Sequence, residues 1–245
     1  MQRKSPACIQ GDSTDPGSWE RALEGRKADV LLSDPPYCLL TRRRKEGDLR
    51  DPKHKKIDRG PVRRFETVRE FRDFTRRWLE VAVKHVTPDA PLVLWMNLLG
   101  REPMTAVCRE LGYEFVRGEF VWGKRTREGN SGEEILRVVE TALVFSRTPA
   151  PTQAFDCPAL PWAAVAGYDD DGEAAAWGNH PNHKPFGVLE PLVRTWSRPG
   201  QLVMDPFAGS GSIPAAAVRL GRQIACIELE AEWAERVTQR IAAQG

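Results

Sequence analysis

Long apolar runs, paired cysteines and a strong charge imbalance are all absent from this sequence. No run approaches the roughly 20 apolar residues needed to span a bilayer, and the N-terminal stretch lacks the apolar core of a signal peptide. We therefore expect a cytoplasmic protein with no membrane contact. The five cysteines are scattered, and none belongs to a C-x-x-C pair. Their pattern argues against a disulfide framework and against a zinc ribbon.

The distribution of apolar residues favours a single α/β domain over residues 1–245. With 245 residues and a hydrophobic content of 41%, the chain can bury one full core. Helical periodicity over 71–82 and 104–111 alternates with short apolar runs, which are typical of strands covered on both faces. We predict a doubly wound, mixed but mostly parallel sheet. Its seven strands are expected at 7–12, 28–34, 91–97, 119–124, 138–146, 201–207 and 222–230.

Two regions depart from this alternation. Residues 41–64 hold eleven Lys and Arg against four acids, although the whole chain has a net charge of only +2. Such a run is often only a solvated loop, but a polyanion docked beside it would meet a concentrated positive field. Residues 148–182, rich in Ala, Pro, Gly and Asp, have no clear period, and we expect an insertion or a mobile loop there.

The stretch ADVLLSDPPYCLL, residues 28–40, places a carboxylate at the end of an apolar strand. Asp34 is followed by two prolines, which end the strand and form a rigid corner, and then by the ring of Tyr37. In isolation this tetrapeptide is also compatible with a simple turn whose carboxylate is satisfied locally. The position at the open end of a strand raises the question of a functional role.

A second motif, LVMDPFAGSGSIPAAAVRLGRQIACIELE, begins at residue 202. A strand leads to Asp205, a turn with Gly209 and Gly211 follows, and an Ala-rich helix then leads to a strand that ends near Glu228. Glycines in such a turn allow close approach of a ligand, and the distal acid suits ribose hydroxyls, so the pattern favours a nucleoside cofactor. No Gly-Lys-Ser/Thr follows, which argues against a phosphate-binding P-loop. A tight strand-to-helix connection is the plainer alternative.

Together the two motifs resemble those of the S-adenosylmethionine-dependent DNA methyltransferases that modify exocyclic amino groups, in the permuted arrangement called the beta class. In that class the catalytic D/N/S-P-P-Y/F motif precedes the cofactor motif, as residues 34–37 precede 205–211 here. The blocks IQGDS, EFVWGKRT, VVETALVFSR and HPNHKPFGVLEPLVRTWSRPG are also similar to the family's consensus, in the same order. The resemblance implies a Rossmann-like methyltransferase fold with a circularly permuted motif order.

Amino-group chemistry gives the first motif a role that agrees with this resemblance. An exocyclic amino group is a poor nucleophile because its lone pair is delocalised into the ring. The carboxylate of Asp34 and the carbonyl of Pro35 can each accept one N–H and orient that lone pair. Pro36 helps to fix the corner, and Tyr37 offers a stacking face for a base extruded from the duplex. We therefore predict Asp34, Pro35, Pro36 and Tyr37 as catalytic residues.

The resemblance also implies S-adenosylmethionine as cofactor and a set of residues that bind it. Asp12 matches the family residue near the cofactor adenine, although an Asp after Gly is as often a turn former. His180 and Lys184 match a block that flanks the methionine end. A metal pair of His180 and His183 is not expected, because no further ligands are apparent. The implied cofactor-binding residues are Asp12, His180, Lys184, Asp205, Phe207, Ala208, Gly209, Ser210, Gly211 and Glu228.

Double-stranded DNA is the implied partner. Residues 39–69 are expected to be a basic DNA-contacting insertion, and residues 148–182 a target-recognition insertion. Phosphate contacts are predicted for Arg42, Arg43, Arg44, Lys45, Lys124 and Arg125. Trp122 is expected to pack in the core. The protein is expected to be a monomer or a homodimer, and a cognate restriction endonuclease is a conceivable companion.

Several related activities can be weighed against this one. Carbon-5 cytosine methylation uses a Pro-Cys thiolate, and the chain has no Pro-Cys pair. Enzymes that methylate protein glutamine or ribosomal RNA place the cofactor motif first. The DPPY motif favours N6 of adenine, and N4 of cytosine by the same mechanism is the alternative. A non-catalytic nucleic-acid-binding protein of the same fold is a more remote one.

Overall fold

A computed structural model of the chain describes residues 8–40, 63–127, 134–149 and 162–244. Within these ranges no helix is both long and apolar enough to cross a membrane. The residues Arg42, Arg43, Arg44 and Lys45, for which phosphate contacts are predicted, lie outside the described residues.

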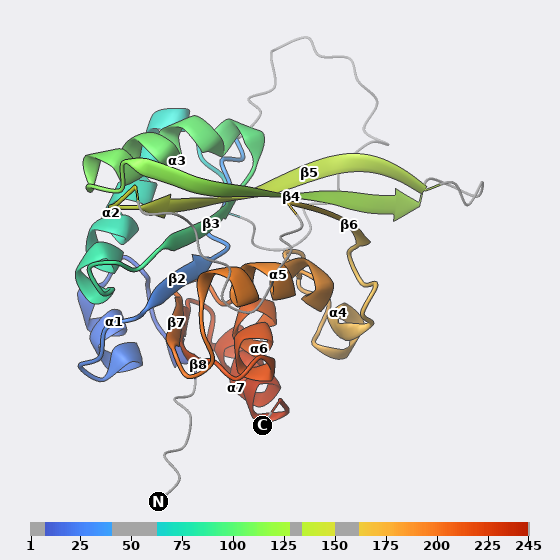
Figure 1. Cartoon of the computed structure of the whole chain (residues 1–245). Coiled ribbons are helices and arrows are strands. Elements are labelled where there is room, and N and C mark those ends of the chain that lie inside the picture. The colour runs from blue at the N-terminus through green and yellow to red at the C-terminus, as the bar shows by residue number, and fades with distance from the viewer. Residues whose placement is uncertain (1–7, 41–62, 128–133, 150–161, 245) are drawn as a thin grey trace, which may run out of the picture.

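The described strands form one eight-stranded sheet in the order β1-β8-β7-β2-β3-β5-β4-β6 (Figure 1). Neighbouring strands are parallel except at β5, which is antiparallel to both β3 and β4. The strands are β1 (Ile9–Gln10), β2 (Val30–Ser33), β3 (Leu92–Met96), β4 (Phe115–Arg127), β5 (Glu134–Ser146), β6 (Ala163–Gly167), β7 (Leu202–Asp205) and β8 (Gln223–Glu228). This confirms the predicted α/β fold with a mostly parallel sheet.

The predicted number of seven strands was wrong, because β6 was not recognised. Its sequence, AAVAG, has no apolar alternation and packs at the edge of the sheet, where Val165 remains 61% exposed. Burial therefore imposed no pattern that could be read from the sequence. Residues 148–182 were expected to form an insertion or a mobile loop, and the part that forms β6 is not a loop, because it pairs in parallel with β4 from Val121 to Arg125.

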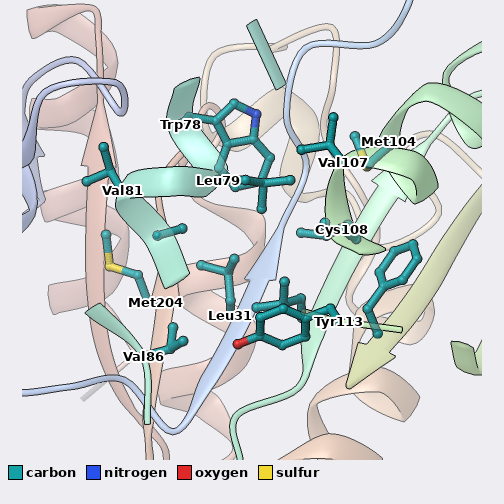
Figure 2. Close-up of a cluster of buried hydrophobic side chains, with 14 of the residues drawn as sticks. Leu31, Trp78, Leu79, Val81, Val86, Met104, Val107, Cys108, Tyr113 and Met204 are labelled. Atoms are coloured by element: carbon teal, nitrogen blue, oxygen red, sulfur yellow. The ribbon is translucent and has the colours of Figure 1, made fainter. Parts of the chain in front are cut away.

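Helices cover both faces of the sheet. One face carries α1 (Pro16–Leu23), α2 (Val68–His85) and α3 (Leu98–Glu110), and the other carries α5 (Phe186–Trp196), α6 (Ser212–Arg219) and α7 (Ala231–Ala242), while the short α4 (Glu173–Ala176) lies near α5 (Figure 1). Alternate residues of the central strands enter opposite cores. On the first face, Leu31 and Met204 belong to one buried cluster with Trp78, Leu79 and Val107 (Figure 2). These two cores account for the continuous apolar strands.

Helix α3 begins next to the Pro-Pro corner. Asn97 caps the helix by accepting a hydrogen bond from the Gly100 N–H at 3.0 Å. Its amide Nδ2 also donates to the carbonyl of Cys38 at 3.0 Å. One capping side chain therefore anchors both the start of α3 and the chain that leaves the corner.

The two sequence motifs meet at the carboxyl edge of the sheet. Strands β2 and β7 are parallel neighbours, with Leu31 opposite Met204. Just beyond this register, the Ser33 hydroxyl donates to Asp205 Oδ1 at 2.9 Å. In open α/β sheets ligands bind at this edge, where the strand order reverses. The fold thus places Asp34 beside Asp205, although the two are far apart in the chain.

Candidate active site

A cavity of about 320 Å³ opens at this edge, within the size range of small-molecule sites. Both motifs line it. The predicted site residues in its wall are Asp12, Asp34, Pro36, Tyr37, His180, Lys184, Asp205, Phe207, Ala208, Gly209, Ser210 and Glu228. Arg63, Phe74 and Trp233, which the sequence did not single out, also contribute to the wall.

The glycine-rich turn, residues 206–211, brings backbone close to the cavity. Gly209 has a φ of +50°, and a Cβ there would lie 3.1 Å from the His180 ring. The Gly209 N–H donates to Glu228 Oε2 at 2.7 Å. Burial raises the pKa of Glu228. The predicted acid and the predicted glycine therefore face the same space.

Gly211, predicted to bind the cofactor, packs toward α7. Its φ is +75°, and a Cβ would lie 3.2 Å from Cγ2 of Val237 in α7. The residue caps α6 and does not belong to the cavity wall. Its small size permits close packing of the turn against this helix.

Asp12 and His180 occupy the rim of the turn. Asp12 Oδ1 accepts from both the backbone N–H and the hydroxyl of Thr14 at 2.8 Å, so this residue forms a local turn and lines the cavity as well. The His180 ring meets Trp233 edge-on at 4.5 Å between centroids. Burial lowers the pKa of His180 to about 4, so its ring is neutral at neutral pH. His183 is buried and faces Asp171, with 3.4 Å between Nε2 and Oδ1.

Asp205 is the most deeply buried acid of the second motif. Its Oδ1 accepts from Ser33 and from the Phe207 N–H, while its buried Oδ2 has no hydrogen-bond partner among the described residues. Burial raises the pKa of Asp205 to about 7. A buried oxygen of this kind is a position where a ligand donor is expected.

Lys184 lies at the Asp-Pro-Pro-Tyr corner, residues 34–37, instead of in the glycine-rich turn. Its Nζ is 2.7 Å from Asp34 Oδ2, and its side chain is only 2% exposed. It also donates to the Tyr37 hydroxyl oxygen at 3.2 Å. The sequence assigned Lys184 to the methionine end of the cofactor, and this contact with Asp34 was not predicted.

Glu140 completes the corner and was missed by the sequence analysis. Its Oε2 accepts from the Tyr37 hydroxyl at 2.7 Å and from Lys184 Nζ at 2.9 Å. Its other oxygen forms a salt bridge with Lys124. The available signal was a lone acid in the apolar strand VVETALVFS, because an acid buried in such a strand requires cationic partners. We call Asp34, Tyr37, Lys124, Glu140 and Lys184 the ionic network.

Charges in the ionic network are balanced, with two carboxylates and two ammonium groups. Burial alone would raise the pKa of Glu140, but Lys184 and Lys124 outweigh it and lower that pKa to about 2. Burial also lowers the pKa of Lys184, yet Asp34 and Glu140 more than compensate and hold it above its usual value. Burial raises the pKa of Asp34, which Lys184 partly offsets.

Tryptophans surround the buried lysine. Lys184 Nζ lies 4.7 Å from the Trp95 ring centroid and 5.7 Å from that of Trp122. Both indoles are fully buried, which agrees with the expected core role of Trp122. Rigid aromatic walls therefore restrict the positions that the ammonium group can occupy.

The described residues predicted to contact DNA are already paired. The Lys124 side chain is 18% exposed and bonded to Glu140, a placement that argues against a phosphate contact. Arg125 pairs with Asp170 at 2.8 Å in an exposed position. Arg63, the first described residue of the basic run 41–64, lines the cavity with its guanidinium 4.0 Å from the Phe74 ring centroid.

Comparisons with known proteins agree with this geometry. A family model for N6/N4 methyltransferases, described as DNA methylase, matches residues 28–239. The "Putative methylase YubD" of Escherichia coli (strain K12) is 27% identical over 223 residues, which are 89% of this chain and 84% of the relative.

Two solved structures share the fold. The M1.HpyAVI–SAM complex has a TM-score of 0.66 at 16% identity, and the match covers 96% of this chain and 98% of that one. The PvuII DNA methyltransferase (cytosine-N4-specific) has a TM-score of 0.66 at 19% identity, over 97% of this chain and 89% of that one.

Proposed function

The chain belongs to the N6/N4 family of DNA methylases, and on this basis we propose that it transfers a methyl group from S-adenosylmethionine to an exocyclic amino group of a base in duplex DNA. N6 of adenine is the favoured acceptor, because the corner reads DPPY. The order of the two motifs, catalytic before cofactor, supports assignment to the beta class.

One observation carries the proposal: both motifs line a single cavity. Asp34 and Tyr37 come from the end of β2, and Asp205, Gly209 and Glu228 come from β7, the glycine-rich turn and β8. Methyl transfer needs the donor and the acceptor side by side in a fixed geometry. A cavity shared by a nucleoside-type turn and an amino-orienting corner supplies that arrangement.

The turn fits S-adenosylmethionine. Glu228 ends β8, where a carboxylate suits ribose hydroxyls, and Gly209 presents its backbone to the cavity without a side chain. Asp205 Oδ2 is buried and has no partner among the described residues, so it can accept a donor from the cofactor. Neutral His180 and Trp233 add an aromatic rim. When bound, the cofactor supplies an activated methyl group, and the M1.HpyAVI structure is described as a complex with SAM.

The corner fits the acceptor base. The Asp34 carboxylate and the Pro35 carbonyl each accept one N–H of the amino group, which turns the nitrogen lone pair toward the methyl donor. The base must leave the duplex to reach this position. Tyr37 then stacks on it, with its hydroxyl held by Glu140. Leu39 and Arg63, which belong to the predicted insertion 39–69, line the cavity, and this supports a DNA contact by the insertion.

N4 of cytosine is the second candidate. The PvuII enzyme, whose description specifies cytosine N4, has the same TM-score as the M1.HpyAVI complex. Both amino groups need the same two acceptors, so the corner accommodates either. The role of residues 148–182 in target recognition remains part of the proposal, as do the monomer or homodimer and the companion endonuclease.

Digestion of the product to nucleosides tests the proposal directly. Duplex DNA is incubated with the purified chain and labelled S-adenosylmethionine, digested, and analysed by liquid chromatography and mass spectrometry. We expect N6-methyldeoxyadenosine. N4-methyldeoxycytidine would establish the alternative, and calorimetric cofactor binding without methyl transfer to any duplex would instead support a non-catalytic binding protein.

A further inference from the structure

We infer that Lys184 is a positioning residue for methyl transfer: it holds Asp34 as a carboxylate with one oxygen engaged and the other left for the target amino group. Glu140 in turn holds Lys184. This inference rests on the proposed function, because it gives the ionic network a task in that reaction.

The hydrogen-bonding capacity of Lys184 is fully used. An ammonium group has three donors and no acceptor. Its three partners are Asp34 Oδ2 at 2.7 Å, Glu140 Oε2 at 2.9 Å and the Tyr37 hydroxyl oxygen at 3.2 Å. The Tyr37 proton is donated to Glu140, which leaves its oxygen free to accept from Lys184. Each donor and acceptor role is therefore consistent, and no Lys184 proton remains for a cofactor carboxylate.

The second carboxylate oxygen of Asp34 is the atom of the corner that can still accept a hydrogen bond. Oδ1 is buried and has no hydrogen-bond partner among the described residues, while the Asp34 side chain lines the cavity. Buried carboxylate oxygens are normally paired, so an unpaired one needs an incoming donor. An N–H of the extruded base meets that need. With Oδ2 bonded to Lys184, the carboxylate cannot rotate without losing its ion pair.

Lys184 is the source of positive charge closest to this carboxylate among the described groups. The ionisable side chains that face Asp34 are Tyr37 on its own segment, Glu140 from β5, Asp205 from β7 and Lys184 from the segment before α5. Lys124 from β4 reaches Glu140, and neutral His180 lies nearer the turn. Burial and Glu140 favour a protonated Asp34, and the Lys184 ammonium opposes them.

Glu140 explains how Lys184 keeps its charge during turnover. When nitrogen bonds to the methyl carbon and the carbon–sulfur bond breaks, the product nitrogen must release a proton. If Asp34 Oδ1 takes that proton, Asp34 loses its negative charge. Glu140 still faces the lysine at 2.9 Å, so an anionic partner remains. The second bond from Glu140 to Lys124 then limits rotation of this acid.

The pH dependence of single-turnover methylation tests the inference. Removing the ammonium in Lys184→Met leaves burial of Asp34 unopposed, so the Asp34 pKa rises and the carboxylate forms only at higher pH. We expect the acidic limb of the rate profile to move upward by about one to three pH units, with a rate about 10- to 1000-fold lower near neutral pH. The Kd for S-adenosylmethionine, measured by calorimetry, should change by less than about threefold.

Lys184→Arg is the matched control, because it keeps a positive charge. It should retain the acidic limb of the wild-type enzyme even if its rate is lower. Glu140→Gln keeps Lys184 and removes a negative charge that raises the Asp34 pKa, so its acidic limb should not move upward as that of Lys184→Met does. It also provides a second test if the methionine variant fails to fold by circular dichroism.

Two results would overturn the inference. One is a Lys184→Met profile whose acidic limb coincides with that of the wild type, or a Glu140→Gln profile whose limb moves upward as far as that expected for Lys184→Met. The other is a large loss of cofactor affinity without a shift of the limb, which would return Lys184 to the cofactor site. Failure of the proposed function is distinguishable, because the wild-type chain would then methylate no duplex at any pH.

Discussion

The glycine-rich turn and the corner at residues 34–37 line the same cavity but are built in different ways. The turn comes from one continuous stretch, from β7 through α6 to β8, and presents backbone groups together with Glu228. The corner depends on the ionic network, in which Asp34 meets Lys184 across 150 residues of sequence. Local backbone geometry thus determines one half of the site, and long-range ion pairs determine the other. Mutations in one half of the site should therefore leave the function of the other half intact.

Asp34→Asn should have the largest effect and should affect only the corner. The change keeps the shape of the side chain but removes the negative charge that binds Lys184. It also leaves only one oxygen of the side chain to accept hydrogen bonds, so Lys184 and the target amino group cannot both be bound. We expect methyl transfer to fall by about 1000-fold or more, with the Kd for S-adenosylmethionine within about threefold of the wild type. A radiolabel assay and calorimetry on one preparation measure both. Near-normal activity would remove Asp34 from the mechanism.

Glu228→Ala should produce the opposite result. Loss of the ribose acceptor, and of the partner of the Gly209 N–H, should weaken S-adenosylmethionine binding about 10- to 100-fold. The acidic limb of the pH–rate profile for methyl transfer should stay at its wild-type position, because the ionic network is intact. Glu232→Ala is the control, since that acid is 74% exposed on α7 and pairs with Arg236. Equal cofactor affinity in both variants would contradict the assignment of Glu228.

Gly211→Ala tests whether Gly211 serves packing of the turn or ligand binding. Its positive φ and the nearby Val237 predict a loss of about 1–3 kcal/mol in the free energy of unfolding. Gly221→Ala shares the positive φ, but the nearest atom to its Cβ would be 3.9 Å away, so it should show the smaller, purely conformational cost. Urea denaturation of both variants measures the difference. A variant that folds normally but loses cofactor affinity would restore the original prediction for Gly211.

Replacing Arg43 and Arg44 with uncharged residues should have the smallest effect of these four changes. If each contacts a phosphate, DNA binding should weaken for all sequences alike, and the log–log salt slope should fall by about 0.9 per contact. Lys124→Gln should leave that slope unchanged, because Lys124 is paired with Glu140. Fluorescence anisotropy at several salt concentrations measures both. An unchanged slope in the arginine variant would indicate a solvated loop.

The sequence by itself determined the features that depend on neighbouring residues. Short apolar runs indicated the strands buried on both faces, and the two prolines after Asp34 and the glycines before α6 marked the corner and the turn. The strand β6 was not predicted, because an edge strand with little burial needs no apolar alternation. Gly211 was recognised as special, but its contact with α7 depends on a helix that follows later in the chain.

Only the tertiary structure decided which charges meet. Lys184 was assigned to the cofactor by its sequence block, and Glu140 was an ordinary acid in a strand, yet folding places both against Asp34 and Tyr37. The physical reason is that a buried charge is stable only beside its counter-charge, and sequence spacing does not encode contacts across 103 or 150 residues. Local patterns therefore located the two motifs, and packing of the sheet determined how Asp34 is held.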